Sequence, residues 1–418
     1  MATQKELLFL AHRIPYPPNK GDKIRSFNLL KHLAQNYRVH VGAFVDDPHD
    51  WRYRADLQAM CDELCLLDLH PLRRRVASLQ GLLTGQPLTL PYYAHPGMQR
   101  WVNQLLVRRP IDAVVVFSSP MAQYAETHIG AARRRVVDFV DVDSDKWAQY
   151  ARAKTWPVSW IYNREARTLL RYERKIASEF DAAVFVSEHE SALFKQLAPE
   201  VAERSFGISN GVDTDYFSPE RDYPNPYEHS GQVLVFTGAM DYWANVDAVR
   251  WFAEEIFPDI RLRVPGVTFY IVGARPTPQV QELAKHPGVV VTGAVKDIRP
   301  YLAHAVAAVA PMRIARGIQN KVLEAMAMGR PVLATPEAAE GINARHSVEL
   351  LVASEVASLQ NHAVRLLRDG VEELARAARQ CVLKQYGWQE NLRRFDELLD
   401  GNIAAVNTAG EPMTRVAT

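Results

Sequence analysis

The sequence predicts an α/β protein built from two doubly wound domains, and three observations support this. The chain has 418 residues, which is too long for a single hydrophobic core of ordinary size. Two domains of roughly 200 residues are therefore expected. Short apolar runs alternate with amphipathic segments along the chain, as expected for parallel strands covered by helices. A stretch rich in Pro, Asn and Ser, residues 218–232, interrupts the series and indicates a boundary.

The predicted strands form two series, one on each side of that stretch. The first series comprises residues 7–10, 39–44, 113–117, 135–140 and 182–186, and the second comprises residues 233–238, 267–273, 289–293, 305–311 and 331–335. Ligands of doubly wound sheets bind beyond the carboxyl ends of the strands, so the predicted site lies in a cleft between the domains.

The domain boundaries follow from the same reading. We expect an N-terminal domain in residues 1–210, a C-terminal domain in residues 211–386, and a helix in residues 387–405 that returns to the N-terminal domain. A polar tail, residues 406–418, is expected to be disordered.

Composition argues against several classes of protein. Lys and Arg number 49 against 48 Asp and Glu, which gives no global field that would attract nucleic acid. Cys61, Cys65 and Cys381 are not joined by a second Cys or His set at zinc spacing, which indicates a reducing compartment and no metal site. No apolar run resembles a signal peptide or approaches the ~20 residues that span a bilayer. We therefore expect a cytoplasmic protein.

The loop after the first predicted strand carries the sequence "PYPPNKGDKIRSF". Its prolines and Gly21 predict an extended loop and a helix that starts near Asp22 or Lys23, with N–H groups aimed beyond the strand. The loop either contacts an anion or sugar or is simply a stiff connection. Neither a Walker A motif nor G-x-G-x-x-G occurs, which argues against P-loop NTPases and ordinary nicotinamide enzymes. Gly238, at a strand end, permits close approach of a ligand to the backbone.

Four acids alternate in "VDFVDVDSDKW", at positions 138, 141, 143 and 145. They are compatible with chelation of a cation that carries a nucleotide diphosphate, or with helix capping at a strand-to-helix turn. A calcium loop is excluded, because Lys146 and Arg152 stand where that loop needs glycine and an acid. We expect Asp141 to face the cleft and contact a sugar or acceptor.

A long helix predicted in residues 156–180 mixes aromatic residues and arginines. It is compatible with an anionic membrane surface or a lipid-linked acceptor. A solvated helix with i,i+4 ion pairs is the preferred interpretation.

Cations gather in residues 311–329, around the start of a predicted helix. Arg313, Arg316 and Lys321, with the amides of Gly317 and Ile318, predict a diphosphate site, because a helix N-terminus carries about half a positive charge. Glu324 lies one turn further on and can accept hydrogen bonds from both hydroxyls of a ribose. The alternative is a surface pair of Lys321 and Glu324 worth only ~0.3 kcal/mol.

Two of these segments resemble motifs of a known family. "SNGVDTDYFSP" is similar to the N-G-V-D-x-x-x-F-x-P turn of glycosyltransferase family 4, and "NKVLEAMAMGRPVLAT" resembles its signature E-A-M-A-x-G-x-P-V-x-A-T. The order of motifs matches the family from residue 7 to about residue 390. More narrowly, "HRIPYPPNKGDKIRSFNLLKHLA" and "RGIQNKVLEAMAMGRPV" resemble sugar transferases associated with bacterial exosortase and exopolysaccharide systems.

The resemblance implies a GT-B fold, in which two Rossmann-like domains face each other across a cleft. It implies a nucleoside-diphosphate sugar donor held mainly by the C-terminal domain, transfer of a hexose-type sugar with retention of configuration, and no metal or other cofactor. The acceptor would be a glycan or a lipid-linked glycan, which is compatible with peripheral contact with the inner membrane.

The sequence departs from the family pattern in two places. The family commonly has two glutamates seven residues apart; Glu324 matches the second, which binds the ribose, whereas Arg316 stands at the first. The Arg and Lys common after the first strand of the second domain are replaced by Ala239 and Asn245. We infer that Arg316 and Lys321, with Arg313 and Arg275, supply this charge to the diphosphate.

Two alternative functions remain open at this point. A GT-B nucleotide-sugar epimerase would act on the donor alone. A non-catalytic scaffold would bind a nucleotide without turnover.

Overall fold

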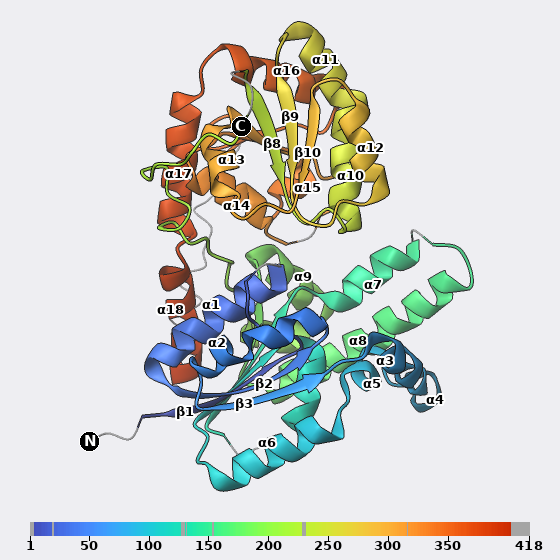
Figure 1. Cartoon of the computed structure of the whole chain (residues 1–418). Coiled ribbons are helices and arrows are strands. Elements are labelled where there is room, and N and C mark those ends of the chain that lie inside the picture. The colour runs from blue at the N-terminus through green and yellow to red at the C-terminus, as the bar shows by residue number, and fades with distance from the viewer. Residues whose placement is uncertain are drawn as a thin grey trace. The chain divides into compact units, whose positions relative to one another are not determined.

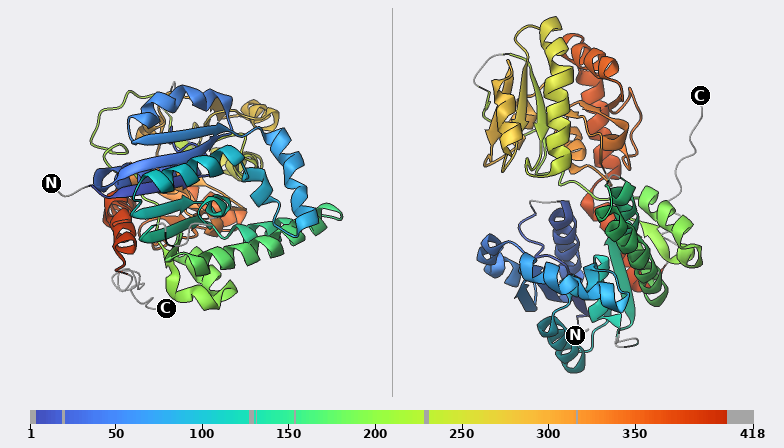
Figure 2. Two further views of the ribbon diagram at one scale, coloured as in Figure 1. Left: turned by 90° about the horizontal axis from the view of Figure 1, so that it is seen from below. Right: turned by 90° about the vertical axis from the view of Figure 1, so that its right-hand side faces the viewer.

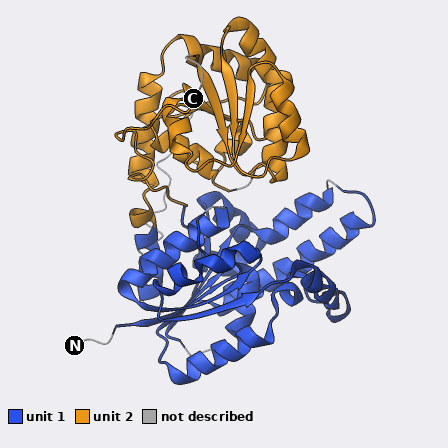
Figure 3. Ribbon diagram, in the orientation of Figure 1, with its two compact units in different colours: residues 1–209, 392–418 blue, residues 210–391 orange. Residues whose placement is uncertain are grey.

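The computed structural model describes residues 4–18, 21–126, 130, 132–152, 154–227, 231–315 and 317–402. It divides into two compact units, unit 1 (residues 1–209 and 392–418) and unit 2 (residues 210–391), coloured separately in Figure 3. Each unit is a parallel sheet covered by helices (Figures 1 and 2). The cleft between the domains remains a prediction.

Unit 1 contains a seven-stranded sheet in the order β3-β2-β1-β4-β5-β6-β7, with every pairing parallel. The strands are β1 (Glu6–Ala11), β2 (Arg38–Val45), β3 (Glu63–Asp68), β4 (Ala113–Phe117), β5 (Arg134–Val140), β6 (Ala182–Phe185) and β7 (Ser205–Gly207). The helices are α1 (Gly21–Asn36), α2 (Arg54–Gln58), α3 (Pro71–Ser78), α4 (Gln80–Thr84), α5 (Thr89–Tyr93), α6 (Pro96–Arg108), α7 (Asp143–Arg152), α8 (Val158–Glu179), α9 (Glu188–Leu197) and, from residue 392 on, α18 (Trp388–Asp400).

Unit 2 contains a six-stranded parallel sheet in the order β10-β9-β8-β11-β12-β13. The strands are β8 (Val233–Thr237), β9 (Thr268–Val272), β10 (Val289–Gly293), β11 (Ala307–Ala310), β12 (Val332–Ala334) and β13 (Leu351–Val352). The helices are α10 (Trp243–Trp251), α11 (Phe257–Arg263), α12 (Pro278–Glu282), α13 (Arg299–His304), α14 (Asn320–Ala327), α15 (Pro336–Ala339), α16 (Val356–Arg368) and α17 (Glu372–Gln385).

Burial on both faces explains why the central strands are continuous apolar runs. Every residue of β1, β4 and β8 is buried, because helices cover both sides of a doubly wound sheet. The sequence pattern missed β3, β7 and β13. The first of these is a half-exposed edge strand, and the other two have only three and two residues, too few to show a period.

The units divide between residues 209 and 210, one residue from the expected domain boundary, and the turn-rich stretch lies after this point. Residues from 210 onward belong to unit 2, where the Val212 amide donates to Tyr386 O at 2.8 Å and Arg379 Nη1 donates to Phe217 O at 2.8 Å. The turn-rich stretch is therefore a connection packed on unit 2. The C-terminal part of α18 belongs to unit 1, where Asp396 lies 2.8 Å from His32 Nε2. The predicted tail, residues 406–418, lies outside the described residues.

Each sheet has one point where the chain order reverses. In unit 1 this point lies between β1 and β4, and in unit 2 it lies between β8 and β11. Loops at the carboxyl ends of these strand pairs diverge to opposite faces and leave a crevice that is the usual ligand site of such sheets. These two crevices are therefore where functional side chains are expected.

Candidate functional site

Helix α14 places Lys321 and Glu324 at the crevice of unit 2. Five of its eight residues are buried apolar side chains that anchor it to the sheet: Val322, Leu323, Ala325, Met326 and Ala327. Lys321 and Glu324, three residues apart, are half-buried on the remaining side. The packing face therefore fixes where both polar side chains lie.

The Lys321 ammonium lies between the carboxyl ends of β8 and β11. Its Nζ donates to Asn245 Oδ1 at 2.6 Å and lies 3.7 Å from Met312 Sδ. It also lies 4.6 Å from the centroid of the Phe236 ring. Asn245 is in the first turn of α10, after β8, and Met312 follows β11, so the contacts come from both sides of the order reversal.

Asn245 is held in the orientation that presents its oxygen to Lys321. Its Nδ2 donates to Ala239 O at 2.9 Å, which assigns Oδ1 to the lysine. A Cβ at Gly238 would lie 2.8 Å from Asn245 Nδ2, so glycine makes room for this side chain. Gly238, predicted to contact the donor, thus shapes the crevice by admitting Asn245.

Burial shifts the titration of both charged groups on α14. It lowers the pKa of Lys321 to about 8, with the Glu324 carboxylate opposing the shift. It raises the pKa of Glu324 to about 7, opposed by the Lys321 ammonium. Among the described residues the Glu324 carboxylate accepts no hydrogen bond, and its separation from Lys321 Nζ exceeds the 4.0 Å of an ion pair. A cation and an acceptor are thus both available to a ligand.

The other predicted cations of unit 2 already have acidic partners. Arg275 donates through Nε to Asp241 Oδ2 at 2.6 Å, and Arg313 donates through Nε to Asp247 Oδ2 at 2.9 Å. Both pairs are formed by a guanidinium and a carboxylate at the surface. Binding of a diphosphate by either arginine would compete with its carboxylate. Arg316 lies outside the described residues.

A glycine turn precedes the helix. The helix starts at Asn320, after Gln319 as N-cap, because Gly317 has a left-handed φ of 59° that cannot continue a helix. Gly317 and buried Ile318 therefore belong to the loop before α14.

The four alternating acids of unit 1 serve different purposes. Asp138 is fully buried and accepts from Arg25 Nε at 2.8 Å, so it is a structural ion-pair partner. Asp143 and Asp145 stand in the first turn of α7, as helix-capping acids do. Asp141 is half-buried between β5 and α7. Within the described part of the chain no group of three or more metal-binding side chains is arranged to hold a metal ion.

A polar cluster that the sequence reasoning missed lies at the crevice of unit 1. Arg13 Nη1 lies 2.5 Å from Asp22 Oδ2 and Arg13 Nε lies 2.8 Å from Asp46 Oδ2, while His12 Nε2 lies 3.4 Å from Asp22 Oδ2. Burial opposes ionisation of Asp22, but the His12 hydrogen bond and the Arg13 charge outweigh it and hold its pKa well below the usual range. Gly21 is the first residue of α1, directly before Asp22.

A sequence signal for this cluster existed. His12 and Arg13 directly follow β1 and Asp46 directly follows β2, and the carboxyl ends of neighbouring parallel strands meet at one edge.

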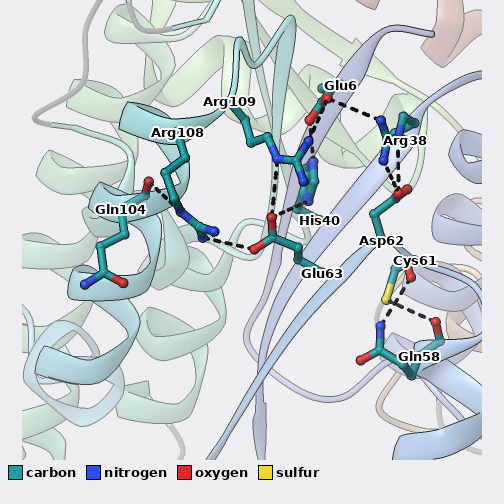
Figure 4. Close-up of polar contacts among 10 residues, drawn as sticks. All are labelled: Glu6, Arg38, His40, Gln58, Cys61, Asp62, Glu63, Gln104, Arg108 and Arg109. Atoms are coloured by element: carbon teal, nitrogen blue, oxygen red, sulfur yellow. Dashed lines mark hydrogen bonds and ion pairs between the residues drawn. The ribbon is translucent and has the colours of Figure 1, made fainter.

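A second concentration of charge lies at the opposite, amino-terminal edge of the same sheet (Figure 4). His40 Nε2 lies 2.8 Å from Glu6 Oε2, and Arg108 Nη2 lies 3.0 Å from Glu63 Oε2. A surface hollow of about 310 Å³, lined by Arg38, Cys61 and Asp62 among others, lies at this edge too. These charges pair with one another, and this edge is not where doubly wound sheets bind ligands. We assign the network to stability.

None of the described helices combines the length and the apolar character needed to cross a bilayer.

Residues 231–369, most of unit 2, match a family model described as "Glycosyl transferases group 1". A search of curated proteins finds no significant match.

Solved structures of similar fold cover nearly the whole chain. HepE from Anabaena, solved with UDP and glucose, matches with a TM-score of 0.66 and 16% identity over 95% of this chain and 100% of its own. Sucrose-phosphate synthase from Thermosynechococcus elongatus matches with a TM-score of 0.69 and 16% identity over 96% of this chain and 100% of its own. A glycosyltransferase from Rickettsia africae matches with a TM-score of 0.66 and 13% identity over 96% of this chain and 99% of its own. The chain therefore has the GT-B fold, and the part of it that matches the glycosyl transferases group 1 model is the part that contains Lys321 and Glu324.

Proposed function

We propose that the protein is a glycosyltransferase that moves a hexose-type sugar from a nucleoside diphosphate to a glycan or lipid-linked acceptor, with retention of configuration. The observation that carries the proposal is the Lys321 ammonium, which lies at the order reversal of unit 2 with a neutral amide as its 2.6 Å partner. A half-buried cation that forms no ion pair with a described residue, at a ligand-binding crevice, favours an anionic ligand. The family model covers this same crevice.

Lys321 compensates for the cation that the family pattern places after the first strand of the second domain. Asn245 stands near that position, and the Lys321 ammonium reaches it from α14. In this proposal the positive charge for the diphosphate comes from α14 and not from the segment that follows β8. Arg275 and Arg313 contribute less in this proposal, because each would have to leave a carboxylate first.

The chemical role follows from the charge that develops during transfer. As the bond between the sugar and the β-phosphate breaks, negative charge grows on the departing nucleoside diphosphate. Lys321, Arg316 and the amides of Gly317 and Ile318 would stabilise this charge electrostatically. Glu324 would accept hydrogen bonds from the two ribose hydroxyls and fix the nucleotide in place.

Unit 1 would supply the acceptor side. Asp141 would contact the reacting sugar or the acceptor, and the loop at Gly21 would close over the diphosphate. The cluster of His12, Arg13, Asp22 and Asp46 offers further hydrogen-bonding groups at the crevice of this unit. An acceptor in exopolysaccharide biosynthesis that is linked to a lipid would require the protein to reach a membrane surface.

Turnover with a panel of nucleotide sugars tests the assignment. Because HepE was solved with UDP-glucose, UDP-sugars are the first donors to assay, followed by GDP- and ADP-sugars. We expect Lys321→Ala and Glu324→Ala each to reduce kcat/KM at least tenfold, while Lys296→Ala, at an exposed position of unit 2, leaves it unchanged. Wild-type rates in both site variants would disprove the site.

The same assay separates the rival functions. Excess EDTA should leave the rate unchanged, and strict metal dependence would restore a chelating role for Asp141 and Asp143. A new sugar nucleotide formed from donor alone would indicate an epimerase. Donor binding without transfer to any acceptor extract would indicate a scaffold, for which the Arg at position 316 is the supporting observation.

A further inference from the structure

A row of apolar side chains on α3 and α4 faces solvent. Leu72, Val76, Leu79 and Leu83 are spaced four, three and four residues apart, which is the spacing of one helix face. Such a face normally packs against a core, yet the exposed fractions of these four residues are 76%, 70%, 54% and 91%. The row is therefore an unpartnered apolar face.

The segment that carries this row is basic and has no acid. Residues 69–111 contain six arginines and neither Asp nor Glu. Arg73 and Arg75 are exposed beside the apolar row, and neither forms an ion pair with a described residue. Arg108 and Arg109, at the far end of the segment, pair with Glu63 and so belong to the network at the opposite edge.

The start of α8 has the same character. Trp156 and Trp160 are 79% and 53% exposed, and Arg167 and Arg171 are exposed further along the helix. The acids in the same stretch are buried and occupied. Glu165 accepts from the amides of Leu88 and Thr89 at 2.6 and 3.0 Å, and Glu173 accepts from the Ser144 amide at 3.2 Å.

The α3–α4 segment and the start of α8 form one surface of unit 1. Arg164 donates to Gly81 O and Gln86 O, and Glu165 holds the start of α5, so residues 81–89 are tied to α8 one turn beyond Trp160. Figure 1 and the left view of Figure 2 both show α3 and α4 beside α8. We call this surface the basic apolar end: Leu72, Arg73, Arg75, Val76, Leu79, Leu83, Trp156, Trp160, Arg167 and Arg171.

We propose that the basic apolar end binds the surface of a bilayer that carries anionic phospholipids. Aliphatic side chains and tryptophans enter the boundary between headgroups and acyl chains, and arginines beside them are attracted to the phosphates. A protein partner would equally cover the apolar row, but a surface whose exposed charges are all positive over two elements matches a uniformly negative plane. The i,i+4 ion pair of α8 that agrees with a solvated helix, Lys175 with Glu179, lies at the other end of the helix. The proposal does not depend on the transferase activity.

Co-flotation of the full chain with lipid vesicles tests this binding. Two compositions are compared: phosphatidylcholine alone, and phosphatidylcholine with phosphatidylglycerol as about a third of the lipid. We expect binding to the anionic vesicles that weakens as salt rises, because screening shortens the reach of the charges. Each arginine near the surface contributes about fivefold to partitioning, so Arg73→Gln with Arg75→Gln should lower it about 25-fold. Leu83→Ser should lower it roughly tenfold.

Matched variants on unit 2 serve as controls. Leu262→Ser changes a side chain that is 80% exposed, and Arg250→Gln with Arg263→Gln removes the same charge from arginines paired to Glu254 and Asp259. These controls should partition like wild type, and all variants should melt within a few degrees of wild type because every position is exposed except half-exposed Arg263.

Three outcomes would overturn the proposal. The first is equal binding to neutral and anionic vesicles, and the second is equal loss in the control variants. The third is a wild-type protein that does not bind vesicles and sediments as a dimer, while the Arg73, Arg75 and Leu83 variants sediment as monomers. This result would show that a second copy of the chain covers the apolar row.

Discussion

Replacing Lys321 by methionine should stabilise the protein without ligand and at the same time weaken its binding of a diphosphate. Burial lowers the pKa of Lys321 from 10.5 to about 8, so the folded state disfavours the ammonium at neutral pH. The lower pKa sets an upper limit of about 3 kcal/mol, and partial exposure together with the loss of the hydrogen bond to buried Asn245 reduces the expected gain to about 1 kcal/mol. Methionine keeps the length of the side chain, and the Phe236 ring and Met312 offer it an apolar environment.

The pH dependence follows with a definite sign. Between the folded pKa, about 8, and the unfolded one, about 10.5, the unfolded chain binds more protons, so this lysine makes stability rise with pH. In the Lys321→Met variant that rise disappears, and the gain over wild type is fully present below pH 8. For unit 2, with residues 210–391, each kcal/mol corresponds to about 2–4 °C in melting temperature.

The affinity for a diphosphate should fall in the Lys321→Met variant, although its stability without ligand rises. A charge-assisted hydrogen bond contributes about 1.5–3 kcal/mol, so the variant should bind UDP about 10- to 150-fold more weakly and uridine equally well. In wild type, UDP at ~100 times its dissociation constant should add about 2.7 kcal/mol of stability, and at the same concentration this gain should fall to about 0.3–1.4 kcal/mol in the variant.

Thermal melts of wild type, Lys321→Met and the exposed control Lys296→Met, with and without UDP, GDP, ADP and uridine, measure both effects. A lower melting temperature in Lys321→Met would refute the reasoning, because it would show that the ammonium is a stabilising structural group. Unchanged stabilisation by all three diphosphates would refute it as well.

Three further predictions concern single side chains. Glu324→Gln should weaken UDP binding about tenfold in calorimetry but leave the affinity for 2′,3′-dideoxy-UDP unchanged. Equal losses of affinity for both ligands would show that Glu324 does not bind the ribose hydroxyls. Burial raises the pKa of Glu173 well above its usual range, outweighing its hydrogen bonds from Ser144, so wild-type stability should fall as pH rises above about 4.3, by up to ~1.4 kcal/mol per pH unit. Glu173→Gln can still accept from the Ser144 amide through its one oxygen and donate from its NH2 group to the Ser144 hydroxyl, and it should flatten this slope in urea unfolding measured from pH 4 to 8. A slope as steep as that of wild type would show that Glu173 does not cause it. Arg25→Ala leaves Asp138 buried without its partner and should cost about 3–5 kcal/mol in urea unfolding, against less than about 0.5 kcal/mol for the exposed Arg167→Ala, and similar costs for the two would contradict a structural ion pair.

The sequence predicts the central strands well because burial on both faces makes them continuous apolar runs. It misses β3, whose half-exposed edge position gives a mixed pattern, and β7 and β13, which are too short to show a period. The turn-rich stretch lies inside unit 2 and not at its border, because Pro, Asn and Ser indicate turns equally well inside a domain and between domains.

For the site, local spacing was enough to select Lys321 and Glu324, three residues apart on one helix, but it could not find the partner of the lysine. Asn245 lies 76 residues away and is brought to Lys321 by the order of the strands. The same limit applies to Asp138, one of the four alternating acids, which is bound to Arg25, 113 residues away. Long-range pairing of this kind depends on topology rather than on periodicity.

The central claim is that unit 2 holds a nucleoside diphosphate between Lys321 and Glu324. A crystal structure with whichever of UDP, GDP or ADP raises the melting temperature most tests it directly. The account predicts a phosphate oxygen about 2.7–2.9 Å from Lys321 Nζ and the ribose hydroxyls on the Glu324 carboxylate. A nucleotide bound instead at the His12 and Arg13 cluster of unit 1, with the crevice at Lys321 empty, would contradict it.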